Sequence, residues 1–195
     1  MTWIVFAYHL ASRLAYVLYV GIALRRQERS GWLSRRYGAE QGFRRFRRAA
    51  AAVMLNDGAS FMLLCVASAG TLPAGPSRGA AVALGAVLVV VGVGTKLWAG
   101  ATLGADAYYW RNFFPPPPAE QLVPATAGPY RYLRNPMYTV GYLQTYGLAL
   151  ITGSPFGLIA ALFDQIAILA FYRTVELPHF ERARAAGQGS PSHAE

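Results

Sequence analysis

The chain has 195 residues, of which 54% are hydrophobic and only 14% charged, and its formal net charge is +9. Soluble domains carry about 25% charged residues, so this composition excludes an ordinary soluble domain, and its apolar content excludes intrinsic disorder. The single cysteine, Cys65, excludes an intrachain disulfide and a cysteine-based metal site. With only three histidines in the chain as well, we expect no metal.

Five apolar stretches are predicted to cross a membrane, because a spanning helix needs about 20 mostly apolar residues. They cover residues 3–24, 49–72, 80–103, 136–152 and 155–172. The third is the most apolar, and its only charge, Lys96, is expected to snorkel to the headgroups. Gly153-Ser154-Pro155 is typical of a turn in which the proline begins the next helix. The sequence therefore predicts one all-α, polytopic membrane domain over residues 1–195.

Arginines collect in three of the segments that join or follow these stretches. Nine lie in residues 25–48, three in 104–135 and three in the tail 173–195, whereas the two short connections hold Arg78 alone. The positive-inside rule then places the N-terminus outside and these three segments in the cytoplasm. We expect a bacterial inner-membrane protein with a short helix in its tail. Because no Lys or Arg precedes the first stretch, we expect a retained helix there and not a signal peptide.

The basic loop 25–48 ends in Phe43-Arg44-Arg45-Phe46-Arg47-Arg48, directly before the second stretch. Basic residues at this position bind anionic headgroups at about 1 kcal/mol each, which favours an anchoring role. Recruitment of an anionic lipid to an active site is the alternative. Nothing in the loop resembles a reading helix or a base-stacking platform, so we expect no nucleic-acid partner.

Aromatic residues fill the first part of the loop 104–135. They include Tyr108, Tyr109 and Trp110, followed by Arg111. Such residues are typical of the membrane–water interface, but aromatic faces also attract sulfonium and ammonium groups. These four residues are therefore candidates for substrate binding. Pro115–Pro118 predicts a stiff polyproline spacer.

The second part of the loop reads Gly-Pro-Tyr-Arg-Tyr-Leu-Arg-Asn-Pro-Met-Tyr over residues 128–138. Gly-Pro and Asn-Pro predict a structured turn that leads into a helix beginning at Pro136. The free backbone N–H groups at such a helix start suit an anionic group.

This segment resembles the signature of the integral-membrane methyltransferases, which include isoprenylcysteine carboxyl methyltransferases and phospholipid N-methyltransferases. The matching residues are Gly128, Pro129, Tyr130, Tyr132, Arg134, Pro136 and Tyr138. Asn135 stands where many relatives have histidine, and Asn-Pro-Met-Tyr resembles the phosphatidylethanolamine N-methyltransferase branch. The tail has Val175-Glu176 where the family has paired glutamates.

The resemblance implies a methyltransferase that uses S-adenosylmethionine and takes a lipophilic substrate from the bilayer, most directly a phospholipid amine. It implies the following cofactor-binding residues: Gly128, Pro129, Tyr130, Arg131, Tyr132, Arg134, Asn135, Pro136, Tyr138 and Glu176. Glu176 and Arg173 are the candidate catalytic residues. Two alternatives stay open: methylation of a prenylcysteine carboxylate, a thiol or another small lipophile, and a non-catalytic membrane protein that retains the fold.

Polar residues inside the predicted spans are expensive and usually face the protein interior. Arg13 lies near the middle of the first span, at a depth similar to those of Asp57 in the second and Asp164 in the fifth. We therefore expect Arg13 to pair with one of these carboxylates. His179 is expected to be a surface residue at the interface.

Overall fold

The computed structural model describes residues 1–72, 77–115 and 126–188, so Pro116–Pro118 and the end of the tail lie outside the described residues. The helices are α1 (Thr2–Ser30), α2 (Trp32–Tyr37), α3 (Ala39–Ala67), α4 (Arg78–Leu103), α5 (Ala105–Tyr108), α6 (Leu143–Thr152), α7 (Pro155–Phe171) and α8 (Leu177–Gln188). Short 3₁₀ turns connect some of them, and the described residues include no strand. The all-α prediction is thus confirmed for this part of the chain.

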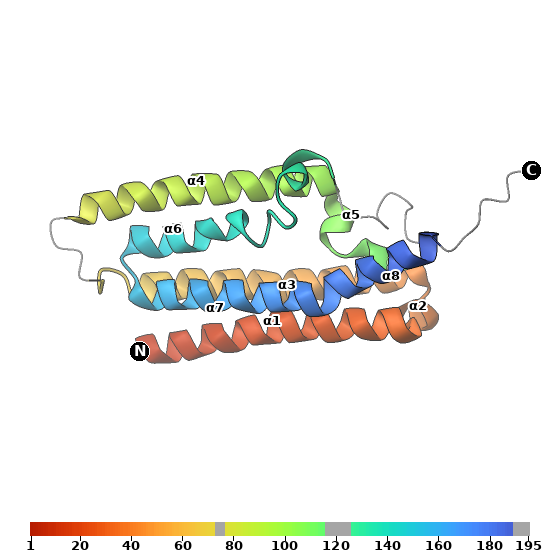
Figure 1. Ribbon diagram of the computed structural model, residues 1–195. Coiled ribbons are helices and arrows are strands. Elements are labelled where there is room, and N and C mark those ends of the chain that lie inside the picture. The colour runs from red at the N-terminus through yellow and green to blue at the C-terminus, as the bar shows by residue number, and fades with distance from the viewer. Residues whose placement is uncertain (73–76, 116–125, 189–195) are drawn as a thin grey trace, which may run out of the picture.

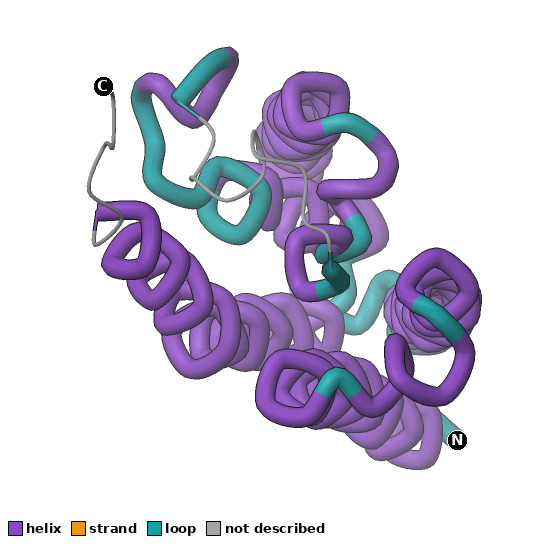
Figure 2. Tube along the Cα trace, turned by 90° about the vertical axis from the view of Figure 1, so that its right-hand side faces the viewer, coloured by secondary structure: helices purple, strands orange, loops and turns teal. Residues whose placement is uncertain are grey.

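The long helices α1, α3, α4 and α7 lie side by side, and α6 lies between α4 and α7 (Figures 1 and 2). The C-terminal end of α1, together with α2, α5 and α8, lies at one end of the bundle, opposite the N-terminus (Figure 1). The arginine-rich segments and the loop that begins at Gly104 therefore share one end, as the charge pattern predicts.

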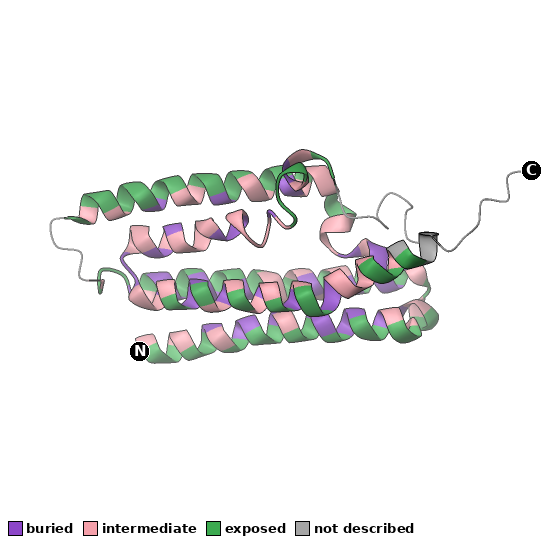
Figure 3. Cartoon of the chain, in the orientation of Figure 1, coloured by how far each residue is buried: buried purple, intermediate pink, exposed green. Residues whose placement is uncertain are grey.

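Four helical segments are long and apolar enough to cross a membrane: Thr2–Ser30, Ala39–Ala67, Arg78–Leu103 and Pro155–Ala183. The predicted count of five is not confirmed, because α6 has only ten residues. At 1.5 Å per residue it is about 15 Å long, half the thickness of the hydrocarbon core. The outward side of α4 is largely exposed and apolar, as expected for a lipid-facing surface (Figure 3).

The segment 136–142 forms turns and the 3₁₀ element η5 (Val140–Tyr142), so the prediction that a helix begins at Pro136 is wrong. The Asn135 carboxamide oxygen accepts a hydrogen bond from the Tyr138 backbone N–H at 3.3 Å. The Pro136 carbonyl accepts one from the N–H of Gly141, at 2.8 Å. The Asn135 bond is the cap that a helix start makes, but Thr139 then has a φ of −104° and a ψ of −90°, which interrupts the helix.

The predicted basic loop 25–48 is mostly helical, because α1 continues to Ser30 and α3 begins at Ala39. Arginine has a high helix propensity, and a helix of 29 residues is about 44 Å long. That length exceeds the hydrocarbon core of about 30 Å. The arginine-bearing ends of α1 and α3 therefore extend beyond the apolar region as helix.

The turn between α6 and α7 is the one that the sequence predicts. Gly153 has a φ of 65°, and Pro155 is the first residue of α7. The Ser154 hydroxyl caps α7 by accepting a hydrogen bond from the Gly157 N–H at 2.7 Å. Arg78 donates to the carbonyl oxygens of Leu150 and Ile151 at the end of α6, which satisfies acceptors that the helix leaves free.

Glycines bring α4 and α6 into close contact. A Cβ at Gly85 would lie 2.7 Å from the Gly147 carbonyl oxygen, and one at Gly147 would lie 2.8 Å from the Val89 nitrogen. A Cβ at Gly92 would collide with the backbone of Gln144. Small residues at such interfaces are typical of helix pairs in membranes, where close packing supplies the attraction.

Replacing Gly92 with leucine should therefore destabilise the protein by at least about 1–3 kcal/mol, the usual cost of overpacking. Gly94→Leu is the matched control, because a Cβ at Gly94 meets nothing within 4 Å. Thermal unfolding in detergent measures both. Equal melting temperatures for the two variants would contradict the close α4–α6 contact.

Candidate active site

Gly128 fixes the start of the predicted motif against the end of α4. It begins the 3₁₀ turn η4 (Gly128–Arg131) with a φ of 57°, in the left-handed region that favours glycine. A Cβ at Gly128 would lie 3.1 Å from Trp98 Nε1 and would collide with the Thr102 hydroxyl. Glycine is therefore required here both by the backbone conformation and by the close approach to α4.

A buried carboxylate joins three distant parts of the chain. Glu176 Oε1 accepts a hydrogen bond from the Tyr138 hydroxyl at 2.6 Å and another from Trp110 Nε1 at 2.6 Å. The Glu176 residue is 8% exposed. The motif segment, the aromatic segment and the tail predicted from the sequence thus meet at one atom.

Two unusual backbone conformations place these partners. Glu176 ends the π-helical turn η6 (Tyr172–Glu176), which connects α7 to α8; such turns occur frequently at functional sites. Trp110 has a φ of 58° and is the one non-glycine residue with positive φ among those described. The strained conformation of Trp110 is characteristic of positions where function constrains the backbone.

Tyr130 lies near this carboxylate. Its hydroxyl donates to Met137 Sδ at 3.1 Å. Burial, and then the negative charge of Glu176, raise the pKa of the Tyr130 hydroxyl. Tyr130 therefore stays protonated near neutral pH and keeps its role as a hydrogen-bond donor.

A cavity of about 720 Å³ begins at Trp110 and Tyr138, the hydrogen-bond partners of Glu176, and extends into the bundle. Tyr108, Trp110, Met137 and Tyr138 line its upper end, which is the end near Glu176. Its walls come mainly from α3, α4 and α6, including Leu55, Met62, Val89, Val93, Lys96 and Gln144. The size suits a lipid headgroup or a drug-sized ligand.

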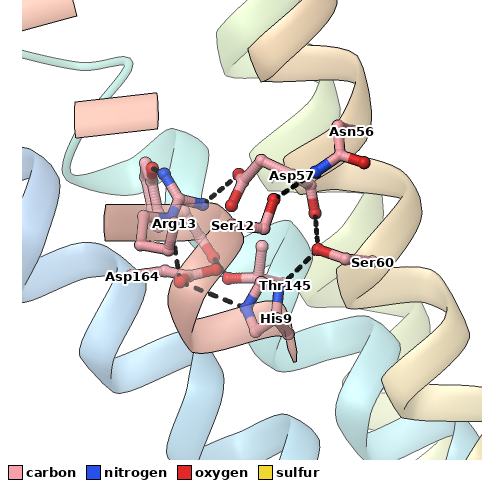
Figure 4. A network of polar contacts seen from close by, with 9 residues as sticks. His9, Ser12, Arg13, Asn56, Asp57, Ser60, Thr145 and Asp164 are labelled. Carbon is pink, nitrogen blue, oxygen red and sulfur yellow. Dashed lines mark hydrogen bonds and ion pairs between the residues drawn. The ribbon is translucent and has the colours of Figure 1, made fainter. Parts of the chain in front are cut away.

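An ionic cluster, whose contacts Figure 4 shows, contributes Arg13, Asp57 and Asp164 to the cavity lining. Arg13 Nη2 lies 2.7 Å from Asp57 Oδ2, and Arg13 Nε lies 2.8 Å from Asp164 Oδ1. Arg13 Nη1 donates to the Tyr142 hydroxyl at 3.1 Å. The predicted pairing is confirmed, and it involves both carboxylates.

His9 is a buried member of this cluster that the sequence reasoning missed. Its Nδ1 lies 2.8 Å from Ser60 Oγ, and its Nε2 lies 3.3 Å from Asp164 Oδ1. His9, Asp57 and Asp164 each offer an atom within 4.8 Å of the others, a spacing that a metal ion could use. The Arg13 guanidinium already binds both carboxylates, so we read the cluster as an ion-paired network.

Several predicted site residues are not part of the cavity lining. Arg131, Tyr132 and Arg134 are exposed on the motif segment, and Arg173 is exposed on η6. Arg111 is half-buried and donates to the Phe114 carbonyl at 2.7 Å, and its guanidinium lies 5.3 Å from the Phe43 ring centroid. Tyr109 packs against the buried core. Of the predicted substrate-binding residues, Tyr108 and Trp110 line the cavity.

His179 is not the surface residue that we expected. Its side chain is 11% exposed, and its Nδ1 lies 2.8 Å from Glu28 Oε1. Its ring stacks on Phe113, with 3.8 Å between the centroids. Arg182 also binds Glu28, with 2.7 Å between Nη2 and Oε2. Helix α8 is thereby attached to the end of α1 and to the aromatic segment.

The comparisons with known proteins match the part of the chain that contains this site. Residues 80–185, more than half of the chain, match the family described as phospholipid methyltransferase. This range extends from the first turn of α4 into α8, and thus includes Trp110, the motif and Glu176. No solved structure matches the chain.

Three curated relatives are phosphatidylethanolamine N-methyltransferases from fungi. That of Saccharomyces cerevisiae is 33% identical over 109 residues, which are 56% of this chain and 12% of the relative. That of Kluyveromyces lactis is 29% identical over 143 residues, 70% of this chain and 16% of the relative. That of Pyricularia oryzae is 32% identical over 155 residues, 75% of this chain and 16% of the relative. The chain thus matches only a small part of the length of these relatives.

Proposed function

Because the chain belongs to the phospholipid methyltransferase family, we propose that it transfers a methyl group from S-adenosylmethionine to the amine of a phospholipid. The observation that carries the proposal is the buried Glu176 carboxylate, whose hydrogen-bond partners Trp110 and Tyr138 line a cavity of lipid-headgroup size. The fungal relatives are phosphatidylethanolamine N-methyltransferases, which favours a phosphatidylethanolamine-type substrate.

The residues around Glu176 fit a cationic ligand. The carboxylate accepts hydrogen bonds from two neutral donors, and no cation within the described residues lies within 4 Å of it. A buried charge is costly unless a charge of the opposite sign compensates it. S-adenosylmethionine carries a sulfonium and an ammonium, and a protonated amine substrate carries an ammonium. Either ligand would supply the missing positive charge.

The aromatic residues at the upper end of the cavity also fit a sulfonium or an ammonium group. Tyr108, Trp110 and Tyr138 line the cavity, and aromatic faces attract sulfonium and ammonium groups. Their bulk also excludes water. Methyl transfer depends mainly on alignment of the reactants and on such exclusion.

When bound, S-adenosylmethionine supplies a methyl group to the amine lone pair, and its sulfur keeps the electrons of the broken carbon–sulfur bond. Only a neutral amine has that lone pair, so a base must first remove a proton from the substrate ammonium. We assign this proton to the Glu176 carboxylate. Arg134, on the exposed motif segment, is our candidate for binding the cofactor carboxylate with its forked guanidinium.

The positions of the arginines determine the proposed orientation of the chain in the membrane. Fifteen lie in segments 25–48, 104–135 and 173–195, and the positive-inside rule puts these in the cytoplasm. The N-terminus then lies outside, in what we propose to be a bacterial inner membrane. Glu176 and the motif would thereby face the compartment that supplies the soluble cofactor.

Cofactor binding is the direct test of this proposal. The protein purified in detergent should bind S-adenosylmethionine with a measurable heat in isothermal titration calorimetry. Retention of the fold, checked by circular dichroism, is the control. A folded protein that shows no binding at millimolar cofactor would overturn the proposal.

A further inference from the structure

Lys96 of α4 reaches into the cavity rather than toward the headgroup region, so the prediction that it snorkels is wrong. It lines the cavity, and its Nζ lies 4.8 Å from the centroid of the Tyr142 ring. A Cβ at Gly141 would lie 2.8 Å from Lys96 Cγ and 3.2 Å from its Cε. Glycine at position 141 therefore leaves the space through which the lysine stem passes.

The Lys96 ammonium has no ionic partner among the described residues. No carboxylate of theirs lies within 4 Å of its Nζ. Asp57 and Asp164, which share the cavity with it, are already bound by Arg13. A charge inside a membrane protein is expensive and usually marks a binding site or a pathway. The Lys96 ammonium, with no carboxylate of the described residues in contact, is therefore open to an anionic group of a ligand.

Lys96 lines the same cavity as Trp110 and Tyr138, the hydrogen-bond partners of Glu176. Its stem crosses Gly141, three residues after Tyr138. A phosphate at Lys96 and an amine at Tyr138 and Glu176 would therefore occupy one cavity. The two-carbon linker of an aminoethyl phosphodiester joins such a pair of groups.

The cavity also opens to the apolar surface of the bundle. Leu55 and Met62 of α3 line it, yet they are 76% and 53% exposed. Both lie in a helix that is long and apolar enough to span the membrane. This opening lets acyl chains remain among the lipids while the headgroup occupies the polar part of the cavity.

We propose that the cavity is the substrate headgroup site and that the Lys96 ammonium binds the phosphodiester of the lipid. The amine then lies against Tyr138, Trp110 and Glu176. This inference rests on the proposed function, and it adds the residue that binds the phosphodiester of the substrate. Lys96 is thus a specificity-determining residue for this reaction.

Binding of two short-chain lipids to the detergent-solubilised full chain tests the proposal. Dioctanoylphosphatidylethanolamine carries the phosphodiester and the amine, and dioctanoylglycerol has the same chains without this headgroup. Lys96→Met should weaken binding of the first about 10-fold or more, as expected for loss of a charge-assisted hydrogen bond, and leave binding of the second unchanged. Lys96→Arg should retain most of the affinity. Arg45→Met, which removes an arginine packed on Tyr37 far from the cavity lining, should bind both lipids as the wild type does.

The outcomes separate this inference from the proposed function. Unchanged affinity for the phospholipid in folded Lys96→Met would overturn the inference, even where S-adenosylmethionine still binds. A lower melting temperature with unchanged affinity would mean that Lys96 only balances the charge of the Arg13 cluster. Binding of both lipids that is weakened equally in Lys96→Met would also contradict the inference. Failure of the wild type to bind S-adenosylmethionine would instead overturn the proposed function.

Discussion

Replacing Glu176 with glutamine should lower the rate of methyl transfer about 100-fold or more, within the range known for loss of a general base. Glutamine keeps the volume and an oxygen that accepts from Tyr138 and Trp110, so the local packing should persist. What it removes is the buried negative charge. Initial rates at saturating lipid, together with the Kd for S-adenosylmethionine, measure the effect.

The two measurements also distinguish the roles of Glu176. A lower rate with unchanged Kd assigns Glu176 to proton removal, whereas a higher Kd assigns it to cofactor binding. Glu181→Gln is the matched control, because Glu181 is an exposed glutamate of α8, and this variant should behave as the wild type. A Glu176→Gln variant that keeps the wild-type rate and Kd would contradict a role for Glu176 in proton removal or in cofactor binding.

Replacing Arg13 with methionine should destabilise the protein by about 3–5 kcal/mol, the usual cost of removing one partner from a buried ion pair. Asp57 and Asp164 would both lose their cation, and their side chains are 7% and 0% exposed. The cost arises from two uncompensated carboxylates within the bundle. Thermal unfolding in detergent should show a melting temperature several degrees lower.

Two further variants check that the effect comes from charge. Adding Asp164→Asn to Arg13→Met should recover part of the loss, because it removes one uncompensated carboxylate. Arg29→Met, at the exposed end of the same helix, should leave the melting temperature within about one degree of the wild type, since exposed charges contribute little. A wild-type melting temperature for Arg13→Met would refute the structural role of the cluster.

Much of the fold follows from the sequence, because hydropathy and helix length are local properties. The long helices, the turn at Gly153–Pro155 and the pairing of Arg13 with carboxylates at equal depth were predicted on these grounds. The motif residues Gly128 and Tyr138 and the tail residue Glu176 were found through resemblance. In the structure, Tyr138 and Glu176 share a hydrogen bond.

The remaining features depend on contacts between distant residues. The late start of α6 results from the non-helical backbone at Thr139 (φ −104°, ψ −90°), which interrupts an otherwise apolar helix. The inward direction of Lys96 requires the space at Gly141, 45 residues later. Hydropathy averages do not contain such information. The signal that would have predicted this contact is a charged residue in one span together with a glycine in the segment that packs against it.

The arrangement of the aromatic segment likewise could not be predicted from the sequence. Four neighbouring residues, Tyr108 to Arg111, were predicted as one binding group, yet Arg111 turns to the Phe114 carbonyl and Trp110 turns to Glu176. The left-handed conformation of Trp110 produces this separation. Because L-residues seldom adopt it, no composition rule predicts it.

We propose that this membrane protein methylates a phospholipid amine. The most direct test is to incubate membranes containing the protein with S-adenosylmethionine labelled in its methyl group and to extract the lipids. We predict that label appears in a phospholipid headgroup, and that Glu176→Gln membranes with equal amounts of protein incorporate far less. Label that appears only in protein or thiol, or no label above membranes lacking the protein, would contradict the claim.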